Sequence, residues 1–314
     1  MKFVQTRGYF NRGARFAFYT WLYRIAVNTA KNHIVAQGRR PPAITMYELG
    51  LLVASCALLG CIVGFLAGLL GIGGGLIIVP VLTSLLLGFN VAAADHVLVI
   101  AIATSLASIL FTSTSSALAH HKNDNVPWKI APWVMSGVAI GALISGFAAS
   151  FIPEKMLRTV FAVSVVFIAM RMVLSARNKV SVGHPMPAGP VLGSISAIMG
   201  ALSGLIGIGG GALLVPMLHY FSVDIKKAIG CAAACGIVIA FFGSIGYVSA
   251  GWQVTDLAHG FMGFVYLPAL LGIVVTSWFI APIGAKATHY LPVNTIKKVF
   301  AMLLVIIAIK MVFS

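Results

Sequence analysis

Charged residues are scarce in this sequence, and their absence defines its class. Only 9% of the 314 residues are Asp, Glu, Lys or Arg, whereas soluble domains carry about 25%. The first long run without any charge extends from Leu49 to Ala94. Five more follow: His96–His121, Ile130–Pro153, Val180–Val223, Ala228–Thr255 and Leu257–Ala285. A helix needs about 20 residues to cross a bilayer core, so each run is long enough to span one.

The sequence also lacks the alternation of polar and apolar residues that is typical of membrane β-barrels. Lipid offers backbone groups no hydrogen-bond partners, so helices are the remaining way to cross the membrane. We therefore predict an all-α polytopic membrane protein, surrounded by lipid, with about eight transmembrane helices.

Acidic residues are absent before Glu48, while eight of the 21 Lys and Arg lie in the first 45 residues. The net charge of +15 invites nucleic-acid binding as an interpretation. We reject it, because the other basic residues lie mostly between the apolar runs. A basic tail on the cytoplasmic face of a membrane protein explains the charge better. An organelle transit peptide is the alternative for this segment.

Cysteine is rare, and none of the four cysteines lies outside the apolar runs. They therefore indicate no disulfide framework. Cys231 and Cys235 are spaced to share a helical face, but no other ligand is nearby in the sequence, so close packing explains them. We expect no metal site and no cofactor.

What the sequence does contain is one pattern written twice. Gly64–Leu82 and Gly200–Leu218 share 12 of 19 residues at an offset of 136. Pro153–Ser175 and Pro292–Ser314 share ten of 23 residues at an offset of 139. Agreement at both ends of the unit predicts an internal duplication.

The joint between the two units falls in a polar stretch that contains Pro185 and Pro187, which suits a linker. We predict a basic tail over 1–45, a first transmembrane repeat over 46–175, a linker over 176–188 and a second repeat over 189–314. Each repeat should hold one long segment and three spans, at 49–88, 96–120, 130–152 and 155–175 and again at 189–222, 227–250, 257–282 and 293–313. The pattern leaves open whether the repeats are inverted or parallel.

Each long segment contains a GIGGG motif, at Gly71–Gly75 and at Gly207–Gly211. Forty residues of helix would be about 60 Å long, twice the apolar thickness, so the segment must fold back. The glycines are the natural breakpoint, since each costs a helix about 1 kcal/mol relative to Ala. A new helix should start after each motif, and its unsatisfied amides and positive dipole end can bind an anion.

Broken helices in paired repeats mark substrate sites in transporters. The alternative, purely structural role for these glycines is close helix packing through GxxxG faces. The candidate substrate-binding glycines are Gly71, Gly73, Gly74, Gly75, Gly207, Gly209, Gly210 and Gly211.

Hydroxyl side chains form a stripe on the span after the first motif. Thr104, Ser108, Thr112 and Ser116 repeat at four-residue spacing, which places them on one face of a helix. Hydroxyls can bind an oxyanion without burying a charge, although they can also bond to the carbonyl one turn back. The candidate hydroxyls are Thr104, Ser105, Ser108, Thr112 and, in the matching span of the second repeat, Ser244.

Two copies of G-x-x-x-G-x-x-G-I-G-G-G-x-x-x-x-P in an eight-span duplicated chain resemble the sulfite exporter TauE/SafE family, also called the toluene sulfonate uptake permease family. The resemblance runs from about Tyr47 to the C-terminus, and Ala103-Thr104-Ser105 is similar to the family's first repeat. Cys231 stands where the family pattern suggests Thr. The resemblance implies sulfite, sulfonates or related organosulfur anions as substrates, whereas the spacing of residues alone reaches only an anion.

The patterns predict a secondary transporter of a small anion. The family resemblance implies that the anion contains sulfur and that it is exported across the plasma membrane, which we expect to be a bacterial inner membrane. The alternatives are an anion channel and a membrane-embedded enzyme. An enzyme is disfavoured, because Ser203-Gly204 follows Ala201-Leu202 and so fails the G-x-S-G nucleophile pattern of an intramembrane serine protease. We expect a non-enzyme whose partners are the anion and membrane lipid, without nucleic acid.

Overall fold

The computed structural model describes residues 45–70, 74–92, 94–122, 124–175, 184–252, 255, 259–287 and 302. All of them belong to the unit Ile44–Ser314. Three expectations lie outside the described residues: the candidate glycines Gly71 and Gly73, the basic tail up to residue 44, and, apart from Met302, the last span over 293–313.

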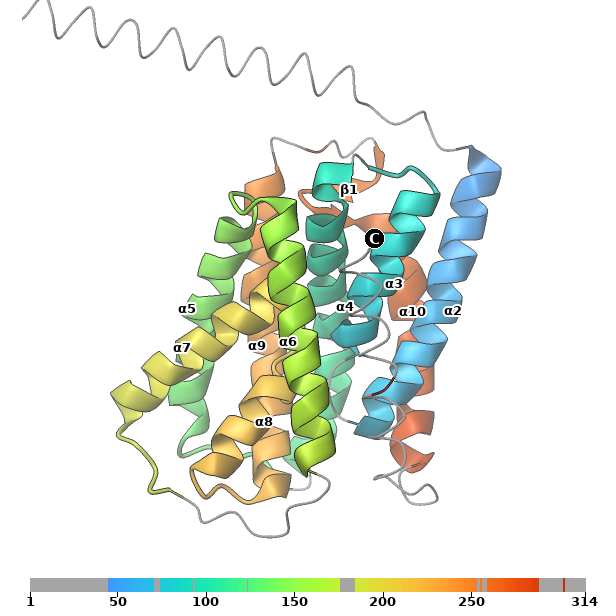
Figure 1. Ribbon diagram of the computed structural model, residues 1–314. Coiled ribbons are helices and arrows are strands. Elements are labelled where there is room, and N and C mark those ends of the chain that lie inside the picture. The colour runs from blue at the N-terminus through green and yellow to red at the C-terminus, as the bar shows by residue number, and fades with distance from the viewer. Residues whose placement is uncertain are drawn as a thin grey trace, which may run out of the picture. The chain divides into compact units, whose positions relative to one another are not determined.

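The described chain is almost entirely helical (Figure 1). Its elements are α2 (Met46–Leu70), α3 (Gly75–Gly88), α4 (Ala94–Lys122), α5 (Ala131–Ala149), α6 (Glu154–Ser175), α7 (Gly189–Ile206), α8 (Gly211–Tyr220), α9 (Ile225–Gly251), β1 (Phe261–Met262), β2 (Val265–Tyr266) and α10 (Leu267–Ala287). Among the described residues, five helices are long and apolar enough to cross a membrane: α2, α4, α5, α7 and α9. The prediction of a multi-span helical membrane protein is confirmed.

Both long segments are broken at their glycines, as predicted. Gly74 precedes α3 with φ 73° and ψ −13°, and Gly210 precedes α8 with φ 80° and ψ −27°. Gly207, which ends α7, is also left-handed at φ 76°. Glycine adopts this region without steric cost. Gly74 and Gly210 therefore lead into α3 and α8 with nearly the same backbone geometry.

Helices of each predicted repeat pair mainly with helices of the other repeat. The most extensive contacts join α2 with α10 and α5 with α7, followed by α5 with α9 and α4 with α9. The long segment of each predicted repeat thus packs on the second span of the other, and the two first spans, α4 and α9, pack on each other. Exchanging the repeats leaves these three pairs unchanged and turns α5–α9 into α10–α4, which is a smaller contact. That is the contact pattern of a pseudo-two-fold axis passing between α4 and α9.

The direction of α4 and α9 decides the orientation of the repeats. A Cβ placed on Gly236 would lie 2.9 Å from Ser113 Oγ, and a Cβ on Gly243 would lie 3.1 Å from Leu106 Cδ1. Residue numbers thus rise along α9 as they fall along α4, so these equivalent spans are antiparallel. Equivalent spans of the two predicted repeats therefore run in opposite directions, which is the arrangement expected of inverted rather than parallel repeats.

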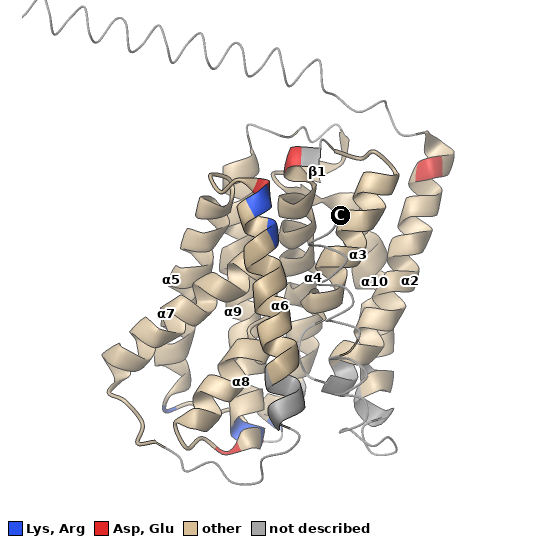
Figure 2. Ribbon diagram, in the orientation of Figure 1, with Lys and Arg blue, Asp and Glu red and all other residues tan. Residues whose placement is uncertain are grey.

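Charged residues in the described part of the chain gather toward the two ends of the helices, and the middle of the described bundle has none (Figure 2). This distribution suits a bilayer, since a charge at the membrane centre costs several kcal/mol.

The region before α10 differs from expectation. We expected a span over 257–282, but the structure has the antiparallel hairpin β1–β2, and the helix begins only at Leu267. Gly260 and Gly263 have φ values of 82° and 56°, which interrupt a helix. Pro268 lies in the first helical turn, where its missing N–H costs nothing. The expected start of this span was wrong for that reason.

Glycines let α5 and α7 approach closely. A Cβ on Gly141 would overlap Ala197 O and lie 2.7 Å from Ala201 N, and a Cβ on Gly200 would lie 2.5 Å from Val138 Cα. Backbone atoms cannot move aside as the tip of a side chain can. Small residues of this kind are the usual basis of helix association in membranes.

This interface yields a stability prediction. Gly141→Ala should lower the free energy of unfolding by about 1–3 kcal/mol, as overpacking does, and should lower the Tm of the purified protein in detergent. Gly50→Ala on α2 is the matched control, because no atom lies within 4 Å of its added Cβ. The control should keep or raise the Tm through better helix propensity. Equal Tm values for the two variants would contradict close contact at Gly141.

Candidate functional site

The second glycine loop is buried within the bundle. All residues from Ile206 to Gly211 are buried. A Cβ on Gly207 would lie 2.9 Å from Val79 Cγ2 on α3 and 3.3 Å from Ile102 Cα on α4. On the other side of the loop, a Cβ on Gly236 of α9 would lie 2.7 Å from Gly209 O. The loop is thus held between elements of both predicted repeats.

The two glycine motifs meet. Gly75, the first residue of α3, lies so close to Gly207 O that an added Cβ would overlap that carbonyl oxygen. Ser105 of α4 donates a hydrogen bond from its Oγ to the same oxygen, at 3.0 Å. We call the contact of Gly75, Ser105 and Gly207 the glycine junction.

The glycine junction lies near the middle of the longest helix. Ser105 is the twelfth of the 29 residues of α4, about 16 Å from its start at 1.5 Å per residue. A site at this position is far from both ends of the helix, where the charges gather.

Two helix N-termini begin at these motifs. The amides of Ile77 and Ile78 bond to Gly74 O, and those of Leu213 and Leu214 bond to Gly210 O. The amides that precede them in α3 and α8 have no acceptor within their own helix. Neither Gly74 nor Gly210 supplies a side-chain cap, so these amides are left for another acceptor.

The two short helices lead away from the motifs in opposite directions. Five residues join α3 to the start of α4, and four join α8 to the start of α9. Since α4 and α9 are antiparallel, α3 and α8 follow opposite halves of the bundle. Each directs its positive dipole end toward the glycine motifs, which is the electrostatic arrangement of an anion site.

One face of α4 contacts the glycines. Ser105 bonds to Gly207, a Cβ on Gly75 would lie 2.8 Å from Ile109 Cδ1, and Ser113 lies against Gly236. These three α4 residues are spaced by four and so share one face of the helix.

The hydroxyl stripe named from the sequence lies one residue away from this face. Thr104 Oγ1 accepts a hydrogen bond from the Tyr266 N–H at 3.0 Å, which ties α4 to the hairpin. Ser108 Oγ donates to Ser105 O at 2.7 Å, and Thr112 Oγ1 donates to Ile109 O at 3.2 Å. Thr104, Ser108 and Thr112 are buried, while Ser116 is half-buried. The hydroxyls of Ser108 and Thr112 bond to carbonyls of their own helix, which is the alternative stated for them from the sequence.

The remaining candidate hydroxyl, Ser244, lies on α9. Its Oγ is buried and has no hydrogen-bond partner in the part of the chain that the structure describes. The sequence did not point to Tyr247 one turn later, whose hydroxyl donates to Gly204 O at 3.1 Å. The sequence feature that could have identified Tyr247 is a phenolic hydroxyl inside a charge-free span.

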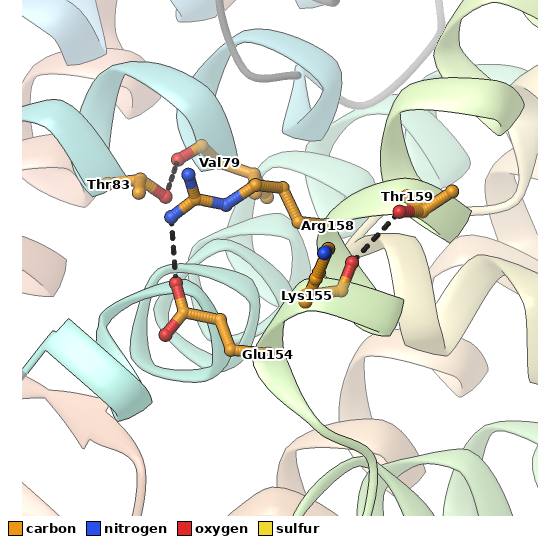
Figure 3. A network of polar contacts seen from close by, with 6 residues as sticks. All are labelled: Val79, Thr83, Glu154, Lys155, Arg158 and Thr159. Atoms are coloured by element: carbon orange, nitrogen blue, oxygen red, sulfur yellow. Dashed lines mark hydrogen bonds and ion pairs between the residues drawn. The ribbon is translucent and has the colours of Figure 1, made fainter. Parts of the chain in front are cut away.

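Arg158 of α6 reaches α3 near Thr83, eight residues beyond Gly75 of the glycine junction. It forms an ion pair with Glu154 on α6 at 2.9 Å, and the two side chains are 26% and 17% exposed. Figure 3 shows the guanidinium extending toward Thr83 of α3, whose own hydroxyl bonds to Val79 O. The charge of Arg158 is thus balanced by Glu154 at the N-terminal end of α6. Among the described residues, no three His, Cys, Asp or Glu cluster as metal ligands would.

One short similarity lies apart from the rest. Over 27 residues, the chain is 89% identical to the ECF RNA polymerase sigma-E factor of Escherichia coli K12, which is 9% of this chain and 14% of that protein. A match this short transfers no activity from that protein.

Comparison with known proteins identifies the larger part of the chain. The family described as sulfite exporter TauE/SafE matches residues 56–311. A probable membrane transporter protein of Haemophilus influenzae is 41% identical over 261 residues, covering 82% of this chain and 96% of that protein. The probable membrane transporter protein YunE of Bacillus subtilis is 28% identical over 274 residues, covering 82% and 96%.

No solved structure matches the chain. The family match nevertheless spans both glycine motifs and every described helix from α3 to α10. Together with the apolar helices, it identifies a multi-pass membrane transporter. The chain belongs to the sulfite exporter TauE/SafE family.

Proposed function

We propose that the protein is a secondary transporter that moves a small sulfur-containing anion, such as sulfite or a sulfonate, across the plasma membrane, and that it exports this anion. The observation that carries the proposal is the glycine junction, where Gly75 meets Gly207. It brings the start of one half-helix against the loop that begins the other. The name of the family supplies the sulfur chemistry.

The binding groups are neutral, which suits transport. Two helix N-termini together carry roughly one positive charge, about half a charge each. The hydroxyl of Ser105 donates its one hydrogen to Gly207 O, and it serves the anion by releasing that carbonyl when substrate binds. The middle of the described bundle holds no fixed cation. An anion is thereby attracted without an ion pair that would hold it too tightly to leave.

The proposed site comprises the eight candidate glycines of the two motifs and Ser105, which already contacts the second loop. The hydroxyls of Thr104, Ser108, Thr112 and Ser244 belong to the proposal as neighbouring groups that shape the site. The inverted arrangement of α4 and α9 supports alternating access, in which one repeat rocks against the other around a central site.

Flux in proteoliposomes tests this function. Uptake of sulfite, sulfate, thiosulfate and a short alkyl sulfonate should be compared, with sulfite or the sulfonate expected to move fastest. A carrier should show saturation and acceleration by substrate on the opposite side. Linear, unaccelerated flux would indicate a channel, and no flux of any sulfur anion would refute the proposed substrate.

A glycine substitution tests the junction. Gly75→Ala should abolish flux while leaving the protein in the membrane, because its Cβ would overlap Gly207 O. Gly88→Ala at the other end of α3 is the matched control, since no atom lies within 4 Å of its Cβ. Wild-type flux in Gly75→Ala would contradict a substrate site at the junction.

A serine substitution tests the hydroxyl. Removing a hydrogen-bond partner from a buried polar group costs roughly 1–3 kcal/mol. Ser105→Ala should therefore raise the apparent substrate constant about tenfold, since 1.4 kcal/mol is one decade. Ser108→Ala is the paired variant, and it should have a smaller effect because Ser108 bonds to its own helix. A larger rise in the substrate constant for Ser108→Ala than for Ser105→Ala would indicate that the anion binds the face of α4 that carries Thr104 and Ser108.

A further inference from the structure

The hairpin β1–β2 lies inside the bundle, although it belongs to the connection between α9 and α10. Phe264 and Tyr266 are only 1% and 2% exposed. The ring of Phe264 lies 5.9 Å from that of His96 in the first turn of α4, and the Tyr266 N–H bonds to Thr104, eight residues further along that helix. The hairpin therefore fills about 12 Å of the bundle, from the end where α4 begins to the level of the glycine junction.

Backbone contacts join the hairpin to α9 of its own repeat. A Cβ on Gly251 would overlap the backbone N of Phe264. A Cβ on Gly263 would overlap the backbone of Val248. The Phe264 N–H also donates to Tyr247 O at 3.5 Å. Because main chain meets main chain here, the hairpin must move together with α9.

Side chains make the link from the hairpin to α4 of the other repeat. Thr104 accepts the Tyr266 N–H through its Oγ1 at 3.0 Å. His96 contacts Phe264 through its ring and is itself exposed. Contacts of this kind can separate without unpacking a helix, whereas the glycine contacts with α9 cannot.

The same residues connect the hairpin to the second glycine loop. Thr104 is followed by Ser105, whose hydroxyl bonds to Gly207 O. Tyr247, whose carbonyl accepts from the hairpin, donates its own hydroxyl to Gly204 O, one turn before Gly207. A displacement of the loop relative to α4 therefore acts on the hairpin as well.

The opposite end of the bundle is closed by a different contact. The connection between α4 and α5 occupies the equivalent place in the first predicted repeat. A Cβ on Gly230 of α9 would overlap Asn125 O of this connection, and the neighbouring Val126 is buried. Each connection thus packs on the central helix of the other repeat, but the hairpin is held there by the hydroxyl of a side chain.

We propose that the hairpin β1–β2 is a gate, which closes the glycine junction from the end of the bundle where α4 begins, and that Thr104 holds it closed. This role rests on the proposed function. When the second repeat rocks against the first, the hairpin leaves α4 with the rest of its repeat and opens a path to the junction. An anion that takes the Ser105 hydrogen bond from Gly207 O frees the loop beside Thr104, and so favours this opening.

Zinc tests the gate, because it can pin the hairpin to α4. Phe264→His places a second imidazole beside the exposed His96, and two adjacent imidazoles can share one zinc ion, which binds each nitrogen at about 2.0–2.1 Å. Zinc should abolish sulfite flux in proteoliposomes of this variant, and EDTA should restore it. The wild type is the matched control, since it has His96 without the second imidazole, and its flux should be unaffected.

Thiol accessibility tests the gate without any transported anion. Ser105→Cys, in a background without the four native cysteines, places a reactive group at the glycine junction. A membrane-impermeant thiosulfonate reagent, added on the side where α4 begins, should modify this thiol. Combined with Phe264→His, zinc should slow the modification about tenfold, because it favours the closed state. A thiol that stays unmodified from this side without zinc would contradict a gate at this end.

A pair of Thr104 variants tests the gate without altering the hairpin. Thr104→Val removes the acceptor of the Tyr266 N–H in the closed state, so the thiol at position 105 should be modified about tenfold faster. Thr104→Ser is the matched control, because it keeps the hydroxyl, and it should preserve the wild-type rate. Equal rates in the two variants would overturn the role of Thr104.

The Tm of the purified Phe264→His protein decides what a zinc result means. Zinc should raise this Tm, since a ligand of the native state stabilises it. No rise would contradict the contact between the hairpin and α4, and a rise with unchanged thiol modification would overturn the gate. Slowed modification without flux of any sulfur anion would refute the proposed function and keep the gate, whereas sulfite flux with unslowed modification would do the opposite.

Discussion

The unpaired backbone at the two helix breaks is the constraint on which the rest of this structure depends. Polar backbone groups in an apolar bundle must find partners inside the protein. The second loop finds them in the other repeat, since Ser105 of α4 donates to Gly207 O. Gly75 lies against the same carbonyl because it has no side chain. The break at Gly207–Gly210 is therefore stabilised by contacts from α3 and α4 of the first predicted repeat.

Helix pairing satisfies this constraint through small residues. The exchanged contacts of α2 with α10 and of α5 with α7 hold the repeats together on both sides of the α4–α9 pair. Gly141 and Gly200 let backbones touch at the α5–α7 interface, in the absence of a hydrophobic force between helices in lipid. The result is a central place where neutral donors and helix ends meet, with charges kept at the two ends of the bundle.

The sequence was sufficient to predict most of the described helices and the breaks before α3 and α8, because run length and glycine content are local properties. It could not identify the contacting face of α4. Stripes beginning at Thr104 and at Ser105 have the same four-residue spacing, and only the position of Gly207, 102 residues away from Ser105, distinguishes them. The hairpin before α10 was missed because its residues are as apolar as a span, and its geometry is set by Gly260, Gly263 and the hydrogen bond from Tyr266 to Thr104.

The central claim is that an anion binds where the two glycine motifs meet. A structure of the full chain determined with a sulfonate bound tests it most directly. The account predicts density for the anion between the N-termini of α3 and α8, within hydrogen-bond distance of their first free amides and beside Ser105. Density for the anion near Arg158, close to the N-terminal end of α6, with the glycine motifs unchanged and empty, would contradict this claim.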